Sequence, residues 1–304
     1  MSVLVLDEQQ VRSLLTMGEC VDAMEAVLQS LARGELHQPL RSVTRPEGSD
    51  SLMGLMPAYR GGTGSAWSLK EIVVAAGNPA RGLDAHQGAV LLHDGETGQL
   101  RALLNASPIT EIRTAAVSAV ATRALARPDS RVVAILGGGV QARSHAAAMR
   151  TVIPGAEIRT WTRGDGGTPE QTLEEADVVC TCTSSREPIV RREWLGSGAH
   201  VNAVGASVPT ARELGADTIL AGTLFVDRRE SALKEAGELL LAGLGEEKIA
   251  AELGDVLVGA HPGRTHAEEL TVFKSLGLGS EDLAAAELVV RKAREQGVGT
   301  EVEF

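Results

Sequence analysis

The sequence predicts an α/β protein in two parts, and three observations lead to this fold class. From residue 131 onwards, short apolar segments alternate with helical segments, a pattern typical of a parallel sheet with crossover helices. Residues 38–105 instead contain β-like runs separated by turn residues, which predicts a mixed and largely antiparallel sheet carrying a helix. At 304 residues the chain is long enough for two hydrophobic cores, given roughly 150 residues for each domain.

The elements of the first part follow from its hydrophobic periodicity. We predict a short strand at residues 3–6 and one helix over residues 8–33, which ends before Gly34. The runs SLMGLMPAY, WSLKEIVVAA and GAVLLHDGETGQLRALLN predict strands, and DGETGQ predicts a hairpin turn within the last run.

Two further helices flank the strands of the second part. Residues 109–126 form an Ala-rich pattern that predicts a helix, with Thr110 as its expected N-cap. Residues 280–297 predict an amphipathic helix that begins with Ser280 as its cap and stops at Gly297. Between them we predict short buried strands at 132–136, 158–162, 177–183, 200–204 and 223–227.

Composition argues against several classes of partner. The net charge of −11 disfavours binding to nucleic acid or to an anionic membrane surface. No basic segment precedes the N-terminal apolar run, and no window approaches the roughly 20 apolar residues of a membrane-spanning helix. The odd set Cys20, Cys180 and Cys182 fits a reducing compartment, and neither these cysteines nor the seven histidines favour a metal site. We therefore expect a soluble, cytoplasmic protein without a metal.

The segment ILGGGVQA carries the motif of a dinucleotide-binding turn. Gly137, Gly139 and Ala142 fit the G-x-G-x-x-G/A pattern between a buried strand and a helix. The first glycine permits a tight turn, the second lets the backbone approach a pyrophosphate, and the small third residue lets helix and strand pack closely. Backbone N–H groups of the helix that begins near Val140 face the phosphates in such a turn. We predict a Rossmann-type dinucleotide-binding domain, with a purely structural glycine turn as the alternative.

Residues after the next strand bear on the choice between NAD and NADP. Thr162 and Arg163 occupy the place where an NAD-binding domain carries an acidic residue for the ribose 2′-hydroxyl. Arginine suits a 2′-phosphate, so NADP(H) is favoured over NAD(H), while the nearby Asp165 leaves NAD open. Only about a dozen residues separate Arg163 from Ala176, so we expect an abridged Rossmann domain.

Further motifs follow one another from about residue 38 to residue 292. They are QPLRSV, LMGLMPAY, AHQGAVLLHDGETG, ITEIRTAAVSAVAT, ILGGGVQARSH, SREPIV, HVNAVGAS, LGDVLVGAHPGR and TVFKSLGLGSEDLAAA. As a set they resemble the ornithine cyclodeaminase/mu-crystallin family. The resemblance implies a homodimer built by the N-terminal sheet domain, a nicotinamide cofactor, and an amino or imino acid bound in the cleft between domains. It implies a substrate-binding and dimerisation domain of residues 1–112 with 280–304, and an NAD(P)-binding domain of residues 113–279.

That family contains several chemistries, which are cyclising deamination of ornithine or lysine, oxidative deamination of alanine, and reduction of cyclic ketimine carboxylates. Its cyclodeaminases resemble NAVGGD at the motif that reads NAVGAS here, so Ser207 stands in place of their aspartate. A serine holds no fixed negative charge beside an ammonium and is no base near neutral pH without a partner. The resemblance is therefore closest to the mu-crystallin-like ketimine reductases, a branch that also binds thyroid hormone.

Four residues are expected to be catalytic. The resemblance assigns Arg41 and Arg113 to the substrate carboxylate, with a surface arginine and a helix-end ion pair as the respective alternatives. Lys70, one of only five lysines, is expected to protonate the imine nitrogen, with an edge-strand lysine as the alternative. Ser207 is expected to bond the substrate nitrogen or a relay water, unless it caps a helix in SVPTARE.

The expected cofactor-binding residues are Thr114, Gly137, Gly139, Val140, Gln141, Arg163, Thr181, Thr183, Val204 and Gly205. For His86 and His200 we favour a structural role over acid–base catalysis. Phe273, Lys274 and Ser275 match a family motif near the cofactor, without an assigned role.

The leading hypothesis is an NAD(P)H-dependent reductase of small 2-imino carboxylates, with cyclic ones such as 1-pyrroline- or 1-piperideine-2-carboxylate preferred. Two alternatives stay open within the family, namely an ornithine or lysine cyclodeaminase and an amino-acid dehydrogenase of the alanine type. The third alternative is a catalytically weak protein that binds NADPH and a ligand, in the manner of mu-crystallin.

Overall fold

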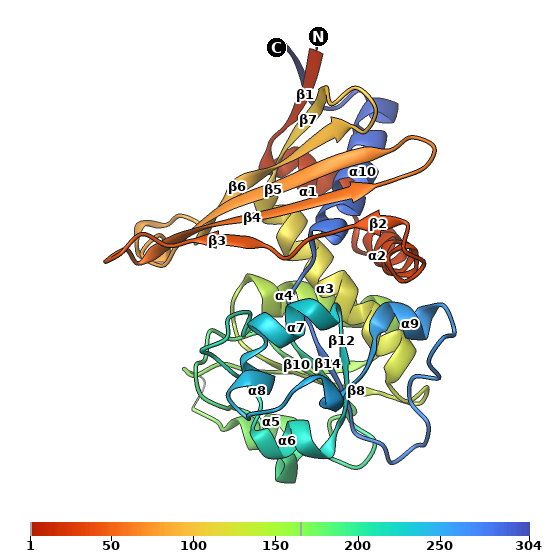
Figure 1. Ribbon diagram of the computed structural model, residues 1–304. Helices are drawn as coiled ribbons and strands as arrows, with labels where there is room; N and C mark the ends of the chain where they lie inside the picture. The colour runs from red at the N-terminus through yellow and green to blue at the C-terminus, as the bar shows by residue number, and fades with distance from the viewer. Residues whose placement is uncertain (1, 165) are drawn as a thin grey trace. The chain divides into compact units, whose positions relative to one another are not determined.

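The structure, a computed structural model, describes residues 2–164 and 166–304 (Figure 1). The chain folds into two compact units, one of residues 1–113 with 278–304 and the other of residues 114–277. Helix α3 (Ala106–Leu125) contributes to both, because the boundary falls between Arg113 and Thr114. Among the described residues, no helix combines the length and hydrophobicity needed to cross a membrane.

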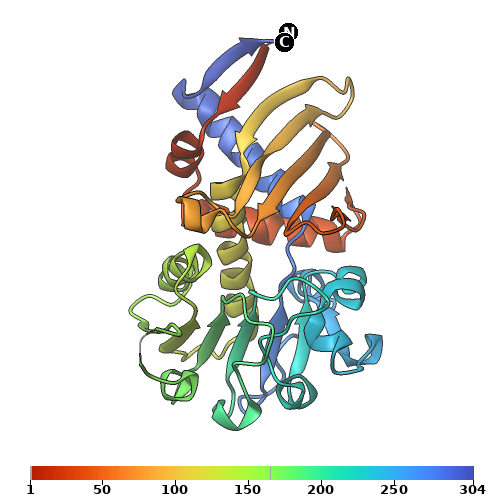
Figure 2. The same ribbon diagram turned by 90° about the vertical axis from the view of Figure 1, so that its left-hand side faces the viewer.

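The first unit is built on one eight-stranded sheet. Its strands are β1 (Ser2–Leu6), β2 (Leu36–His37), β3 (Ser42–Thr44), β4 (Ser51–Arg60), β5 (Ala66–Ala75), β6 (His86–Asp94), β7 (Leu100–Asn105) and β15 (Thr300–Glu303). They follow the order β15-β1-β7-β6-β5-β4-β2, with β3 also paired to β4, and only β1 and β7 run parallel. The predicted mixed, largely antiparallel sheet and its β6–β7 hairpin are confirmed. Because β15 pairs with β1, the two ends of the chain lie side by side (Figure 2).

One face of this sheet is covered by helices. They are α1 (Glu8–Leu14), α2 (Met17–Ala32) and α10 (Gly279–Gln296), and a short 3-10 turn spans Pro79–Arg81. Helix α10 packs against β4, β5 and β6 and lies beside α2, as Figures 1 and 2 show. Side chains alternate between the two faces of a strand, so every second residue of β4 and β5 points toward α10.

The second unit contains a seven-stranded parallel sheet, as the alternation of strands and helices predicts. Its strands are β8 (Val132–Leu136), β9 (Glu157–Trp161), β10 (Val178–Thr181), β11 (His200–Ala203), β12 (Thr223–Val226), β13 (Ile249–Glu252) and β14 (Thr271–Lys274), in the order β13-β12-β14-β11-β10-β8-β9. Strands β13 and β14 of this sheet were not predicted from the sequence. A large buried cluster in this unit consists of Ala, Val, Leu and Ile side chains, consistent with the low aromatic content of 2%.

Among the described residues, seven short or medium helices complete the second unit. They are α4 (Val140–Val152), α5 (Pro169–Leu173), α6 (Ala216–Ala221), α7 (Arg229–Glu235), α8 (Gly237–Leu240), α9 (Leu253–Leu257) and the C-terminal half of α3, with 3-10 turns at Arg192–Trp194 and Glu246–Lys248. Among the described residues between β9 and β10, the five-residue α5 is the one regular element. The prediction of an abridged Rossmann domain is therefore confirmed.

The predicted single helix over residues 8–33 is wrong, because the chain forms α1 and α2 instead. Asp7 and Gln10 form a capping box at the start of α1, and Leu15 leaves the helical conformation with φ −94° and ψ 84°. Thr16 is then the N-cap residue of α2. Leu14 and Leu15 are both buried, so the hydrophobic pattern runs through the break and does not reveal it.

Both predicted N-caps of the longer helices are also misplaced. Helix α3 begins at Ala106, four residues before Thr110, since the side chain of Asn105 accepts a hydrogen bond from the N–H of Ser107. Helix α10 begins at Gly279, so Ser280 lies inside its first turn. Its predicted end is confirmed, with Gly297 in the left-handed conformation at φ 67°.

Candidate functional site

Lys70 lies in the interior of the first unit's sheet. Strand β5 runs between β4 and β6, and Lys70 pairs in register with Met56 on one side and Val90 on the other. Its side chain is 1% exposed and shares the inner face with these two buried residues. The edge-strand interpretation of this lysine is therefore wrong, because a full-length neighbouring strand covers each side of it.

Two acidic residues at the start of α10 pair with Lys70 and Arg113. The Nζ atom of Lys70 is 2.8 Å from Oδ2 of Asp282, and Arg113 Nε donates to Oδ1 of the same carboxylate at 3.0 Å. Arg113 Nη1 donates to Oε2 of Glu281 at 2.9 Å. Arg113 lies within helix α3 and not at its end, so the ion pair that we considered as its alternative role is present, but it joins the interior of α3 to the start of α10.

A third cation, Arg41, also acts on Lys70 through its charge. Burial lowers the pKa of Lys70 to about 8, Asp282 acts in the opposite direction, and the charges of Arg113 and Arg41 lower it further. Arg41 is half-buried in the segment between β2 and β3. We call Arg41, Lys70, Arg113, Glu281 and Asp282 the lysine cluster. It combines a buried ammonium that loses its proton near pH 8 with two guanidinium groups suited to a carboxylate.

The glycine turn joins β8 to α4 in the second unit. Gly137 has φ +134°, and a Cβ atom there would lie 2.5 Å from the carbonyl oxygen of Cys182. Gly139 is the N-cap residue of α4 and provides no side-chain cap, and a Cβ atom on it would meet no atom within 4 Å. The turn thus leaves open space beside the first N–H groups of α4, an arrangement that fits a dinucleotide pyrophosphate.

A buried carboxylate that the sequence did not reveal ties the ends of β10 and β11 together. Glu213 accepts hydrogen bonds from the hydroxyls of Thr181 and Thr183 and from the N–H groups of Thr183 and Gly205, each of 2.7 Å. The carboxyl ends of parallel strands are where open α/β sheets bind ligands. Thr181 is fully buried, and its hydroxyl is used to hold Glu213.

Lys274, to which the sequence gave no role, belongs to the same edge of the sheet. Its ammonium lies 3.0 Å from Oε2 of Glu238 and donates to the carbonyl oxygen of Ala206. Glu238 in turn accepts a hydrogen bond from the N–H of Glu213 at 3.1 Å. Ser207, next to Ala206, is exposed and lies in a non-helical segment, which excludes the helix-cap interpretation.

The remaining expected cofactor residues lie in four places of the second unit. Val140 and Gln141 form the first turn of α4, whereas Val204 and Gly205 directly follow β11. Thr114 is buried in α3. Arg163 is exposed after β9, and the neighbouring Asp165 lies outside the described residues.

His200 lies in the interior of the second unit, whereas His86 lies at an exposed position of the first unit. His200 is fully buried, with Nδ1 at 2.9 Å from the hydroxyl of Thr271, and burial lowers its pKa to about 3. His86 is the first residue of β6, and burial and the charge of Lys70 lower its pKa. Among the described residues, no group of three or more His, Cys, Asp or Glu is arranged to hold a metal ion.

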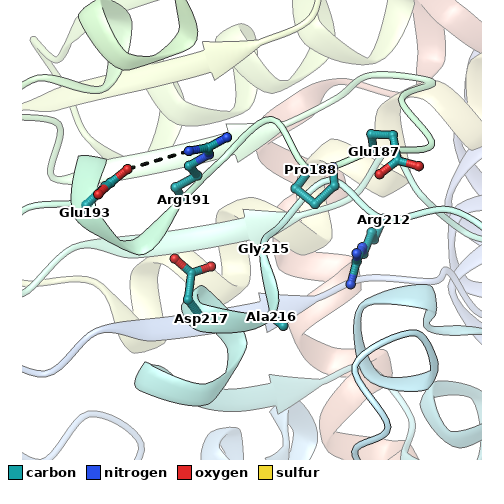
Figure 3. A pocket seen from close by; sticks show the side chains of 8 residues that line it. All are labelled: Glu187, Pro188, Arg191, Glu193, Arg212, Gly215, Ala216 and Asp217. Atoms are coloured by element: carbon teal, nitrogen blue, oxygen red, sulfur yellow. Dashed lines mark ion pairs between the residues drawn. The ribbon is translucent and has the colours of Figure 1, made fainter.

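The second unit also has a surface pocket (Figure 3). Its lining residues carry charges of both signs, and Arg191 pairs with Glu193 at 3.8 Å. They are Glu187, Pro188, Arg191, Glu193, Arg212, Gly215, Ala216 and Asp217. None of the predicted catalytic or cofactor residues is among them, so we give this pocket no part in the site.

The fold and the site residues define a class of protein. A parallel sheet with a glycine turn opening onto an uncapped helix, joined to a second α/β unit, is a dinucleotide-binding α/β protein. The chain belongs to the ornithine cyclodeaminase/mu-crystallin family, whose family model matches residues 1–170 and 166–297.

Individual relatives agree with this assignment. The ketimine reductase mu-crystallin of Mus musculus is 40% identical over 288 residues, which cover 88% of this chain and 90% of the relative. The structure of Thermococcus litoralis Delta(1)-pyrroline-2-carboxylate reductase, in complex with NADH and L-proline, matches at a TM-score of 0.92 and 32% identity, covering 99% and 100% of the two chains. An archaeal alanine dehydrogenase dimer with bound NAD matches at a TM-score of 0.94 and 30% identity over 100% of both chains. The family and fold class that the motifs predicted are confirmed.

Proposed function

We propose that this protein reduces small 2-imino carboxylates, cyclic ones preferentially, with NAD(P)H as the hydride donor. The observation that carries the proposal is Lys70, an ammonium buried in an apolar sheet within electrostatic reach of two arginines. Reduction of a C=N bond needs a proton at nitrogen as the hydride reaches carbon, and a lysine with its pKa near 8 suits that task. Relatives named for ketimine and pyrroline-2-carboxylate reduction support it.

Each member of the site has a separate role. Arg41 and Arg113 attract the substrate carboxylate and fix the direction of the adjoining C=N bond. Such orientation supplies much of the rate, because the hydride chemistry itself belongs to the cofactor. Lys70 gives its proton to the imine nitrogen. Ser207, exposed after β11, holds the nitrogen or a water that relays a proton.

The cofactor is held by the second unit. The glycine turn, the first turn of α4 and the Gly205 edge of the sheet hold NAD(P)H, which when bound supplies the hydride. The preference for NADP(H) is supported by Arg163, an exposed guanidinium after β9 that suits a 2′-phosphate. The solved relatives carry NADH or NAD, so this preference is the part of the cofactor assignment most in need of measurement.

Oxidative deamination of an amino acid is the competing candidate, because an alanine dehydrogenase shares the fold over the whole chain. Ser207 favours reduction, since a serine gives no fixed negative charge to receive an ammonium substrate. Reduction of an existing C=N bond needs no carboxylate at this position.

A substrate panel followed at the NADPH absorbance band tests the proposed function. We expect NADPH to be consumed with 1-pyrroline- or 1-piperideine-2-carboxylate, and Lys70→Met to slow that consumption by about 10²- to 10⁴-fold. Lys234→Met is the matched control, because Lys234 is an exposed lysine in α7 and its loss is expected to change nothing. Ammonia release from ornithine without net change in NADH would instead identify a cyclodeaminase.

The outer face of the first sheet supports a homodimer. Outward-facing residues of β4 and β5 pair across the two strands as Met53 with Val73 and Tyr59 with Trp67, and both Met53 and Trp67 are exposed. Large apolar side chains exposed on one face of a sheet are typical of a protein interface. We expect a dimer by light scattering, and dissociation in the variant Met53→Lys, which places a charge on this face.

A further inference from the structure

Asp282 is the carboxylate that joins the two buried cations of the lysine cluster. Its two oxygens are divided between them, with Oδ2 at 2.8 Å from Lys70 Nζ and Oδ1 accepting from Arg113 Nε at 3.0 Å. Its side chain is 0% exposed. A carboxylate this deeply buried is unfavourable unless it is paired, so its place between the two cations is a specific one.

The start of α10 is built to bring this carboxylate to β5. A Cβ atom on Gly279 would lie 2.9 Å from the carbonyl oxygen of Met56, so a glycine is what lets the helix begin directly against β4. Met56 is the register partner of Lys70 on the neighbouring strand. The N–H of Ser280 donates to Oε1 of Gln38 at 2.8 Å, which ties the segment before Arg41 to the same helical turn.

Titratable groups from four other segments face Lys70. Asp282 on α10, Arg113 on α3 and Arg41 before β3 act on the pKa of Lys70, and Lys70 in turn lowers the pKa of His86 on β6. Burial, Arg113 and Arg41 all favour the neutral amine, and the balance leaves the pKa of Lys70 at about 8. Asp282 is the group in this set that favours the protonated form.

We propose that Asp282 is a positioning residue that keeps Lys70 protonated at neutral pH and aligned beside Arg113. The inference rests on the proposed function in one respect, namely that the retained proton is the one delivered to the substrate. In turnover the hydride of NAD(P)H bonds to the imine carbon, the C=N electron pair takes the proton from Lys70 Nζ, and the neutral amine regains a proton from water. Without Asp282, burial and the charges of Arg113 and Arg41 favour the neutral form of Lys70, which has no proton to give.

The ionisation of Lys70 can be measured directly, without any substrate. The chain has only five lysines, so protein labelled with ¹³C at lysine Cε gives few signals, and Lys70→Met identifies the one from Lys70. We expect the midpoint of its pH titration to fall by about 1 to 3 pH units in Asp282→Asn. Glu287→Gln is the control on the same helix, because Glu287 pairs with Arg60 at 2.6 Å, and it is expected to leave the midpoint unchanged. A Lys70 midpoint in Asp282→Asn that stays at the wild-type value would overturn the proposal.

A second variant separates charge from packing. Asp282→Glu keeps the carboxylate, so we expect the Lys70 midpoint to return toward the wild-type value, and a midpoint as low as in Asp282→Asn would show that packing, not charge, is responsible. In turnover of a cyclic imine by Asp282→Asn, kcat/KM is expected to decrease at a lower pH than in the wild-type protein, by the same shift as the Lys70 midpoint. A wild-type protein that reduces no imine refutes the proposed function alone, whereas an unmoved Lys70 midpoint refutes the role of Asp282 alone.

Discussion

Oε1 of Glu213 accepts two hydrogen bonds from Thr183, one from its backbone N–H and one from its hydroxyl, each of 2.7 Å. The other carboxylate oxygen is used by Thr181 and Gly205. Burial raises the pKa of Glu213, and the hydrogen bonds from the two threonines oppose that rise. One side chain therefore holds the ends of two neighbouring parallel strands at the edge where we place the nicotinamide.

Replacing Glu213 by glutamine is expected to weaken both folding and cofactor binding. An amide turns an NH₂ group toward donors, so at least one of the buried N–H or hydroxyl groups loses its acceptor, at a cost of about 1–3 kcal/mol. We expect a lower melting temperature and a higher Kd for NADPH by fluorescence titration. Glu230→Gln, at an exposed position of α7, is the control, and equal effects of the two variants would contradict the role of Glu213.

Substitution of Gly137 is expected to affect both stability and cofactor affinity, whereas substitution of Gly139 is expected to affect cofactor affinity alone. Alanine at Gly137 forces a side chain into φ +134° and against Cys182, so Gly137→Ala should lower stability as well as cofactor affinity. At Gly139 an added Cβ meets open space, so Gly139→Ala should keep the wild-type melting temperature and still weaken NADPH binding by blocking the pyrophosphate. Unchanged affinity in Gly139→Ala would show that the phosphates do not pass over this turn.

Features of the fold that depend on local sequence patterns could be predicted. The glycine turn, the parallel strands and the hairpin depend on local patterns, so a short window of sequence is enough to find them. Lys70 could also be identified, because lysine is rare in this chain and this one lies within the β-like run WSLKEIVVAA. Helix N-caps could be predicted less reliably. Thr110 and Ser280 are residue types that favour an N-cap position, but each lies inside a helix that begins earlier in the chain.

The counter-ions of the site could not be predicted because their partners are distant in the chain. Asp282 is separated from Arg113 by 169 positions, and only the packing of α10 on β4, β5 and β6 brings them together. In the sequence, SEDLAAA is an ordinary helix start, where acidic residues favour the helix dipole. Glu213 had no local signal either, because its four donors lie at the ends of β10 and β11, between 8 and 32 residues before it.

Arg41 is expected to contribute to substrate binding and not to cofactor binding. Arg41→Gln removes the charge that faces the carboxylate, so we expect the KM of the cyclic imine to rise by about 10- to 100-fold, with the KM of NADPH unchanged. Arg45→Gln, four residues further along at an exposed position, is the matched control. A rise in the KM of NADPH in place of that of the imine would assign Arg41 to the cofactor.

Arg163 is expected to decide the choice between the two cofactors. Arg163→Ser removes the guanidinium proposed to pair with the 2′-phosphate, so the Kd of NADPH should rise about tenfold or more while that of NADH stays the same. Arg150→Ser, at an exposed position near the end of α4, controls for loss of a positive charge from the surface of this unit. Equal weakening of both cofactors in Arg163→Ser would contradict a preference for NADP(H).

The pH dependence of imine reduction is expected to report the ionisation of Lys70. Because burial lowers the pKa of Lys70 to about 8, raising the pH through that value removes the proton that the imine nitrogen needs. We expect kcat/KM to fall above about pH 8 in the wild-type protein. Lys70→Met should be slower by about 10²- to 10⁴-fold, and its kcat/KM should not show this decrease above pH 8. The titration of the imine itself is common to both proteins, so the difference between their profiles isolates the lysine. A rate that instead rises through pH 8 in the wild-type protein would make Lys70 a base, and the reaction it serves an oxidation.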